Sequence, residues 1–242
     1  MVTAIYKVKL KRRQEIASGT MAFHFEKPEG FSYTAGQFGD VTLANPPETD
    51  AEGNTRTFTL ASAPYEGDLM VATRMRDSAF KRVLKSMALG TEVSLNAPDG
   101  SLTLHSDARI PAVFLSGGIG VTPVRSIVLQ ATHDKLPHKI VLFDSNRRPE
   151  DSAFLDELAE TQKRNPNFTL VGTMTEMEKS SKTWSGETGY VTQAMLLKSV
   201  HDLSLPIFYI SGPPAMVAAM RKILDDSGVK DDKIRTEEFA GY

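Results

Sequence analysis

The stretch Leu115-Ser116-Gly117-Gly118-Ile119-Gly120-Val121-Thr122-Pro123 decides the fold of this chain. It follows the apolar run 110–114, which is typical of a buried parallel strand. It precedes Val124, Ile127 and Val128, which recur at helical spacing. The glycines allow a tight turn and the close approach of a ligand, and the unpaired N–H groups of the following helix favour a phosphate. The stretch therefore predicts a strand, a phosphate-binding turn and a helix; a tight connection that binds no ligand is the alternative.

The composition is that of an ordinary globular protein. Of the 242 residues, 40% are hydrophobic and 24% are charged, and the formal net charge is −2. This balance gives no excess of positive charge that would attract nucleic acid or an anionic membrane. Every apolar stretch is too short to span a bilayer. The first residues lack the apolar core of a signal peptide. We therefore expect a cytoplasmic protein with neither a membrane span nor a nucleic-acid partner.

The chain contains no cysteine. This excludes disulfides, a catalytic thiol, a cysteine-bound zinc ion and an ordinary iron–sulfur cluster held by the chain itself. The five histidines are scattered and show no metal-ligand spacing. We therefore predict no metal site.

Hydrophobic patterning divides the chain into two parts. In the first part, short runs alternate apolar and polar residues, as at Tyr6, Val8 and Leu10, and only one helical pattern appears. Short strands of this kind predict a small antiparallel barrel. In the second part, apolar strands alternate with helices, which predicts a parallel sheet covered by helices on both faces. The predicted fold is an antiparallel Greek-key β-barrel over 1–106, followed by an α/β parallel-sheet domain over 107–242.

Two more segments fall at the carboxyl ends of strands in the second part, the edge at which open α/β sheets bind ligands. Segment 207–216 is again a strand, a tight turn containing Gly212 and a helix that begins with prolines. In segment 143–151, Asn146 and Arg147 offer hydrogen-bonding groups where a nucleotide ribose or phosphate would lie. A solvated surface loop is the alternative for this second segment.

Four motifs, in this order, resemble those of the ferredoxin–NAD(P)+ reductase family of flavoproteins. Arg56-Thr57-Phe58-Thr59-Leu60-Ala61-Ser62 is similar to the family's flavin signature, with phenylalanine where the family usually has tyrosine. Segment 116–123 is similar to the pyrophosphate loop for the pyridine dinucleotide. Ser145-Asn146-Arg147 followed by Glu150-Asp151 is similar to the adenosine-side segment, and Ser211-Gly212-Pro213-Pro214 to the turn beside the nicotinamide.

The resemblance implies roles in FAD binding for residues of the barrel. Arg56 would pair with the pyrophosphate through its planar guanidinium. Phe58 would lie against the isoalloxazine, and Thr59 would hydrogen-bond to flavin N5. The remaining residues implied to bind FAD lie along a later strand and at the start of the helix that follows it: Thr73, Arg74, Met75, Ser78 and Ala79.

In the second domain, the resemblance implies that NAD(P)H is bound at the edge described above. Ser211 would form a small polar wall of the nicotinamide site. It would not act as a nucleophile, because no G-x-S-x-G motif surrounds it. The other residues implied to bind NAD(P)H are Gly117, Gly118, Gly120, Val121, Thr122, Pro123, Asn146, Arg147, Gly212 and Pro213.

The end of the chain adds a softer match to the family. Members commonly have an aromatic residue near the carboxyl terminus that stacks on the flavin, after a glutamate that lines the nicotinamide pocket. Phe239 with Glu237 fits that register, and Tyr242 is the alternative stacking residue; a hydrophobic anchor without a flavin contact is the alternative to both. Thr59, Ser211 and Glu237 are thus the predicted catalytic residues.

Over about 36–242, the resemblance implies an NAD(P)H-dependent flavoprotein reductase. Hydride would pass from NAD(P)H to FAD, and electrons would go on to a separate ferredoxin, flavodoxin or oxygenase component. A free-flavin or ferric-chelate reductase is one alternative, and a non-catalytic nucleotide-binding subunit of a larger complex is another. NADP-specific relatives carry a Ser-Arg pair after the third strand of this domain. Segment 172–176 has no arginine there and contains Glu176, which favours NADH, although Arg147, Lys179 and Lys182 are candidates to offset this.

Overall fold

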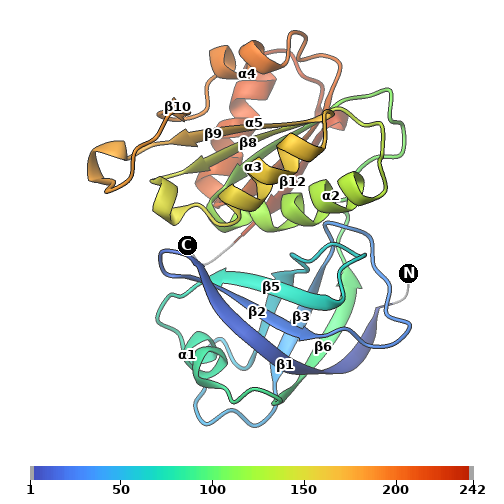
Figure 1. The fold of residues 1–242 in the computed structure, drawn as a ribbon, viewed down its shortest axis with the longest axis vertical. Helices are drawn as coiled ribbons and strands as arrows, with labels where there is room; N and C mark the ends of the chain where they lie inside the picture. The colour runs from blue at the N-terminus through green and yellow to red at the C-terminus, as the bar shows by residue number, and fades with distance from the viewer. Residues whose placement is uncertain (1–2, 240–242) are drawn as a thin grey trace.

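The structure, a computed structural model, describes residues 3–239 and contains two six-stranded sheets joined by segment 100–111 (Figure 1). The first sheet has the order β4-β3-β6-β1-β2-β5, every adjacent pair is antiparallel, and it curls into a barrel-like unit in the lower half of Figure 1. Its strands are β1 (Ala4–Ala17), β2 (Thr20–Glu26), β3 (Phe38–Leu43), β4 (Thr55–Thr59), β5 (Asp68–Arg74) and β6 (Glu92–Asp99), with helix α1 (Ala79–Ser86) between the last two.

Strand β1 belongs to both halves of the barrel sheet. It pairs with β6 over 4–9 and with β2 over 10–17. A register shift between Leu10 and Arg12 marks the change of partner, and such a shift bends a strand. Val8 and Leu10 point into the barrel and are buried, as the alternating pattern predicts.

The second sheet is parallel, with the order β10-β9-β8-β7-β11-β12. It forms the upper half of Figure 1, with helices on both of its faces. Two of its elements, β10 and α4, are not predicted from the sequence. The strands and α-helices are β7 (Ala112–Gly117), α2 (Val121–His133), β8 (Ile140–Asn146), α3 (Leu155–Arg164), β9 (Phe168–Met174), β10 (Glu187–Thr188), α4 (Gln193–Ser199), β11 (Ile207–Gly212), α5 (Pro214–Asp226) and β12 (Ile234–Glu238); the short 3-10 helices are η1 (Gly118–Gly120), η2 (Pro149–Asp151), η3 (Met177–Lys179) and η4 (Asp231–Lys233).

Alternate residues of the central strand β7 contribute to different cores. Phe114 packs in a cluster with residues of α2 and α3, whereas Val113 and Leu115 pack in a cluster with residues of α4 and α5. The two helix pairs therefore cover opposite faces of the sheet. The cluster beneath α2 also includes barrel residues such as Met70 and Ala72, so the face covered by α2 and α3 is the one that meets the barrel.

Among residues 3–239, no helix is long and apolar enough to cross a bilayer. The predicted antiparallel barrel and parallel α/β sheet are both confirmed in the order expected. The boundary proposed at residue 107 falls within the joining segment.

Candidate functional site

A cavity of about 320 Å³ opens between the barrel and the glycine turn of the second domain. Strands β4 and β5 and the start of α1 form its barrel side, and Ile119 and Thr122 form its other side. Eight residues that the sequence predicts to bind FAD or NAD(P)H meet here: Arg56, Phe58, Thr59, Thr73, Arg74, Ser78, Thr122 and Phe239.

Four cations line this cavity, namely Arg56, Arg74, Arg76 and Lys81, and they outnumber the two carboxylates there, Glu52 and Asp77. Burial lowers the pKa of Lys81, and the charges of Arg76 and Arg56 lower it further. The cavity is therefore a place where an added anion is stabilised. Sequence reasoning identified neither Arg76 nor Lys81 as a residue of the site; for Lys81, the available signal was its position three residues after the helix cap Ser78.

Thr59, at the end of β4, is buried and lines the same cavity. Its Oγ1 has no hydrogen-bond partner among the described residues. A buried hydroxyl without a partner is unfavourable, so its position at a cavity wall indicates that a ligand atom completes it. This is the geometry expected of a residue that hydrogen-bonds to a flavin ring.

Arg56 is held by the loop that precedes its strand. Its Nη2 lies 3.2 Å from Asp50 Oδ1 and 2.8 Å from Glu52 Oε2, and its guanidinium lies over the ring of Phe80. Phe58 is buried beside Phe80, with ring centroids 5.8 Å apart. The cation and the aromatic wall predicted for FAD are therefore in place, and two carboxylates already contact the cation.

The start of α1 is capped by side chains. Ser78 Oγ accepts a hydrogen bond from the Lys81 N–H at 3.4 Å, as a cap residue does. The Ala79 N–H donates to Asp50 Oδ2 at 3.0 Å. Met75, by contrast, packs against the barrel core and is not among the cavity-lining residues.

The glycine turn has the conformation predicted for it, a strand followed by a helical turn. Gly118 has φ +56°, in the left-handed region that favours glycine. A Cβ at Gly120 would lie 2.2 Å from the carbonyl oxygen of Ser211, so only glycine fits against β11. Thr122 Oγ1 donates to the Ile119 carbonyl at 2.8 Å. Of the other predicted residues of this turn, Gly117, Val121 and Pro123 are buried.

Ser211 is completely buried, and its Oγ donates to the Gly120 carbonyl at 2.7 Å. It is not among the residues that line the cavity. Its hydroxyl therefore joins the end of β11 to the glycine turn. Gly212 follows it in the strand, and Gly212 O accepts a hydrogen bond from the Phe239 N–H at 3.0 Å. Pro213 caps α5.

A polar cluster lies beneath the adenosine-side segment. Asp144 is completely buried and accepts hydrogen bonds from Ser116 Oγ at 2.7 Å, Asn146 Nδ2 at 2.8 Å and Ser152 Oγ at 3.1 Å. Burial raises the pKa of Asp144 to about 6, although these hydrogen bonds oppose the shift. Asn146 is buried, and its Oδ1 has no partner among the described residues. Sequence reasoning missed Asp144; an acid directly after the apolar run Ile140–Phe143 was the signal.

Arg147 lies at the surface. Its Nε is 3.8 Å from Glu176 Oε1, and Lys179 Nζ is 2.9 Å from Glu176 Oε2. The Lys179 hydrogen bond and nearby positive charges lower the pKa of Glu176. A carboxylate flanked by two cations therefore lies beside the end of β9. The sequence predicts this carboxylate at the place where NADP-specific relatives carry a Ser-Arg pair.

The last strand brings Phe239 to the cavity. Phe239 is half-buried, lines the cavity and packs against the core beneath α2. Glu237 pairs with Ser211 in the register of β11 and β12, and burial raises its pKa to about 7. The alternative stacking residue, Tyr242, lies outside the described residues.

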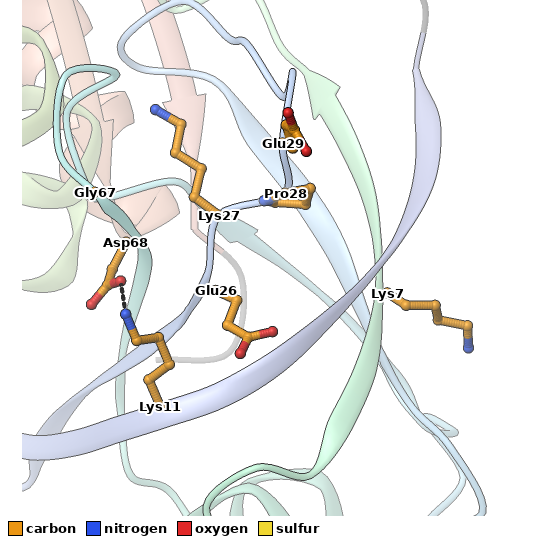
Figure 2. Close-up of a pocket in the computed structure, with 8 residues that line it drawn as sticks. All are labelled: Lys7, Lys11, Glu26, Lys27, Pro28, Glu29, Gly67 and Asp68. Carbon is orange, nitrogen blue, oxygen red and sulfur yellow. Dashed lines mark hydrogen bonds and ion pairs between the residues drawn. The ribbon is translucent and has the colours of Figure 1, made fainter.

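A second pocket lies on the outer surface of the barrel and contains no predicted site residue. Lys7, Lys11 and Lys27 line it together with acidic residues, and Figure 2 shows Lys7 pointing away from the others. Lys11 Nζ is 2.5 Å from Asp68 Oδ1, the pair joined by a dashed line in Figure 2. Its charges are thus mixed and partly paired. No group of three or more His, Asp or Glu residues suited to a metal ion exists within 3–239.

Comparisons with known proteins agree with this arrangement. Residues 114–222 match the family model described as "Oxidoreductase NAD-binding domain". The glycine betaine monooxygenase reductase subunit of Chromohalobacter salexigens is 28% identical over 224 residues, which cover 91% of this chain and 60% of that relative. A component of the Na(+)-translocating NADH-quinone reductase of Yersinia pestis is 30% identical over 207 residues, which cover 78% of this chain and 50% of that relative.

Among solved structures, a ferredoxin NADP+ reductase from Neisseria gonorrhoeae with bound FAD and NADP has a TM-score of 0.77 to this chain. It is 23% identical, and the match covers 97% of this chain and 98% of that one. This chain spans only 50% to 60% of the length of the two relatives named above. With its barrel followed by a parallel sheet, the chain has the fold of the Neisseria gonorrhoeae reductase, and residues 114–222 of its second domain match an oxidoreductase NAD-binding domain.

Proposed function

We propose that this protein is an FAD-dependent oxidoreductase that accepts hydride from NAD(P)H and passes electrons to a separate acceptor. The observation that carries this proposal is Thr59: its Oγ1 is buried and has no hydrogen-bond partner among residues 3–239, and the residue lines a cavity together with four cations. A flavin ring beside Thr59 and a pyrophosphate beside the cations satisfy both features together.

The residues present fit FAD along the length of the cavity. Arg56 and Arg74 would hold the pyrophosphate, Thr59 would donate a hydrogen bond to the flavin ring, and Phe58 and Phe239 would exclude water from it. Thr73 and Ser78 extend the wall on either side. When bound, the flavin supplies the two-electron chemistry, and the protein supplies orientation and electrostatics.

On the other side of the cavity, the glycine turn and the start of α2 would bind the dinucleotide pyrophosphate. Asn146 Oδ1, which lacks a partner among the described residues, would accept a hydrogen bond from the nucleotide. Gly212 allows the end of β11 to approach the nicotinamide closely. Burial raises the pKa of Glu237 to about 7, so its protonated and ionised forms are both populated near neutral pH, and it would orient the nicotinamide amide or exchange that proton.

NADH is the proposed coenzyme. The carboxylate of Glu176 would repel the 2′-phosphate of NADPH, and the two cations that flank it, Arg147 and Lys179, are already paired with it. Replacing Glu176 with glutamine frees both cations. We expect E176Q to lower the ratio of kcat/KM for NADH to kcat/KM for NADPH by about tenfold. This factor corresponds to the interaction energy of one hydrogen-bonded charge pair.

An oxygenase component is the proposed acceptor. The support is the glycine betaine monooxygenase reductase subunit, a relative named as one component of an oxygenase. The relative from the Na(+)-translocating NADH-quinone reductase makes a quinone-reducing complex the second candidate. The cytoplasmic location expected from the sequence stays a prediction.

The test is an anaerobic visible spectrum of the protein reconstituted with FAD, recorded before and after NADH and then NADPH. We expect a bound-flavin absorption band that either nucleotide bleaches, with NADH the faster. A protein that fails to bind FAD and oxidises neither nucleotide would instead be a nucleotide-binding subunit without redox activity.

A further inference from the structure

The carboxylate of Asp50 contacts Arg56, which the proposed function assigns to the FAD pyrophosphate, and the start of α1, where the resemblance places Ser78 and Ala79 in FAD binding. Its Oδ1 lies 3.2 Å from Arg56 Nη2, and its Oδ2 accepts a hydrogen bond from the Ala79 N–H at the start of α1, at 3.0 Å. An arginine fork and a helix N-terminus are the two features that proteins use most readily to hold a phosphate. Asp50 therefore bridges them as an anion supplied by the chain itself.

The rest of the loop occupies the remaining donors of Arg56. Its Nη1 donates to the carbonyl oxygens of Glu52 at 2.9 Å, Gly53 at 3.2 Å and Thr55 at 2.8 Å, while Glu52 Oε2 lies 2.8 Å from Nη2. Both terminal nitrogens of the guanidinium thus face the loop. A pyrophosphate that binds this guanidinium in a bidentate manner has to replace some of these contacts.

The loop that carries Asp50 is held by polar contacts, among them the ion pair of Glu48 with Arg82 near its start. Residues 47–49 and 51–52 are exposed, and a backbone hydrogen bond from the Gly53 N–H to the Asp50 carbonyl, at 2.9 Å, closes the turn. Gly53 has φ +74°, and a Cβ there would meet no atom within 4 Å, so the glycine serves the turn and not a packed neighbour. Exposed turns with few buried contacts open at a small fraction of the global unfolding free energy.

We propose that Asp50 is an internal competitor of the FAD pyrophosphate and that it sets the affinity of the protein for FAD. This inference rests on the proposed function. The Asp50 carboxylate and the pyrophosphate are both anionic and use the same two donors, so the loop has to move away for the cofactor to bind. The cofactor is therefore held more weakly than its contacts alone would allow, and it exchanges with the surrounding solution.

The experiment compares Asp50→Asn with Asp77→Asn. The asparagine at position 50 keeps the shape of the side chain and an acceptor for the Ala79 N–H, but it removes the charge that pairs with Arg56. Asp77 lines the same cavity and pairs with Arg82, which also pairs with Glu48, so D77N removes one negative charge that pairs with Arg82 and not with Arg56. FAD affinity is measured by quenching of flavin fluorescence, and thermal unfolding is measured with and without FAD.

We expect D50N to bind FAD about tenfold more tightly than the parent protein, the factor that one modest ion pair provides. D77N should stay within about threefold, as expected of an exposed charge. D50N should also lower the melting temperature of the flavin-free protein and leave that of the FAD-bound protein unchanged. A merely structural cap would lower both temperatures equally and leave FAD affinity unchanged or weaker, and that result overturns the proposal.

Inorganic pyrophosphate separates this inference from the proposed function. If no variant binds FAD, the proposed function fails, but pyrophosphate still reports on competition for Arg56 and the start of α1. A larger rise in melting temperature with pyrophosphate for D50N than for the parent and D77N supports the inference. Equal responses in all three proteins contradict it.

Discussion

Two buried side-chain oxygens, Thr59 Oγ1 and Asn146 Oδ1, lack hydrogen-bond partners among residues 3–239. Thr59 belongs to the barrel and lines the cavity; Asn146 ends β8 in the second domain. Such atoms lower stability unless a ligand completes them. A mutation that removes either atom should therefore raise the stability of the ligand-free protein and weaken its function.

The first prediction concerns Thr59→Val, which removes the hydroxyl and keeps the branched shape. The flavin-free protein should gain about 1 kcal/mol in unfolding free energy, because an unsatisfied buried hydroxyl is lost. The rate of flavin reduction by NADH should fall by about tenfold, because a hydrogen bond of about 1.4 kcal/mol at the reacting ring is lost. Urea denaturation and anaerobic stopped-flow absorbance measure the two effects. Thr59→Ser keeps the hydroxyl, so a reduction rate as low as that of the valine variant would rule out the hydrogen bond as the cause.

The second prediction concerns Glu237, whose pKa rises to about 7 in the folded protein from an ordinary value of 4.5. A raised carboxyl pKa means that the folded protein binds this proton more tightly than the unfolded chain does. Stability from this group is therefore complete below pH 4.5 and is lost as the pH rises to 7. Glu237→Gln mimics the protonated form and should be more stable than the parent by roughly 1–3 kcal/mol at about pH 8, with no difference at about pH 4.

Denaturation of both proteins across this pH range checks the prediction for Glu237. His24 titrates in the opposite sense, since burial lowers its pKa to about 4 and its contribution is lost as the pH falls from 6.5 to 4. The difference between the parent and E237Q cancels that contribution, because both proteins contain His24. A difference that does not change with pH would show that Glu237 is not the group concerned.

At the scale of elements, the glycine turn is a joint between β7, α2 and β11. Ser211 Oγ bonds to the Gly120 carbonyl, and the backbone of β11 lies against the Gly120 Cα with no space for a side chain. The turn therefore owes its shape to a strand residue that follows it by 91 positions in the sequence. Its phosphate-binding geometry depends on β11 as much as on its own glycines.

The third prediction follows from this joint. In Gly120→Ala, the new Cβ would approach the Ser211 carbonyl to 2.2 Å, and backbone atoms cannot give way as a flexible side chain can. We expect a loss of about 1–3 kcal/mol in stability from overpacking, together with about tenfold weaker NADH binding. Gly67→Ala is the control, because a Cβ there meets no atom within 4 Å. Equal effects of the two substitutions on NADH binding would show that the joint does not shape the site.

Much at this scale is predictable from the sequence because local patterns determine it. The glycine turn is recognisable from the strand before it and the helix after it, and α1 begins directly after Ser78, where a helix start is expected. By contrast, β10 has two residues and α4 has seven, and the polar segment around them offers no sustained periodicity. The contact of Asp50 with Arg56 and Ala79 was also hidden, because a loop closing on a distant helix start is a tertiary event that no local pattern records.

At the scale of the whole molecule, Arg125 of α2 joins the two domains. Its Nη1 donates to the Ala61 carbonyl at 2.7 Å and lies 2.8 Å from Glu66 Oε2 in the barrel, while its Nε lies 2.6 Å from Glu157 Oε2 on α3. Although burial opposes the shift, the hydrogen bonds and charge of Arg125 lower the pKa of Glu66. Sequence reasoning missed Arg125, because one arginine among the apolar residues of a helix is indistinguishable from an exposed one.

The fourth prediction tests the contacts by which Arg125 joins the two domains, called here the Arg125 clamp. Arg125→Ala leaves two carboxylates in a partly buried space without their cation, which should lower the unfolding free energy by about 3–5 kcal/mol. Arg109→Ala is the matched control: Arg109 also pairs with an acid, but its side chain is 90% exposed, so its loss should change stability by less than about 0.5 kcal/mol. Urea denaturation followed by circular dichroism compares the two, and similar losses would contradict a special role for the clamp.

The cluster beneath α2 gives the molecule one further property. It takes residues from β2, β5 and segment 100–111 as well as from the second domain, so the two halves share this core in addition to the barrel's own interior around Val8 and Leu10. A chimera that joins this barrel to the nucleotide domain of a distant relative would place two unmatched surfaces in contact. A folded hybrid is expected only when the residues of the new nucleotide domain that lie opposite Met70 and Ala72 match the original ones in volume. This shared core, and not the joining segment 100–111, therefore limits which domains can be exchanged.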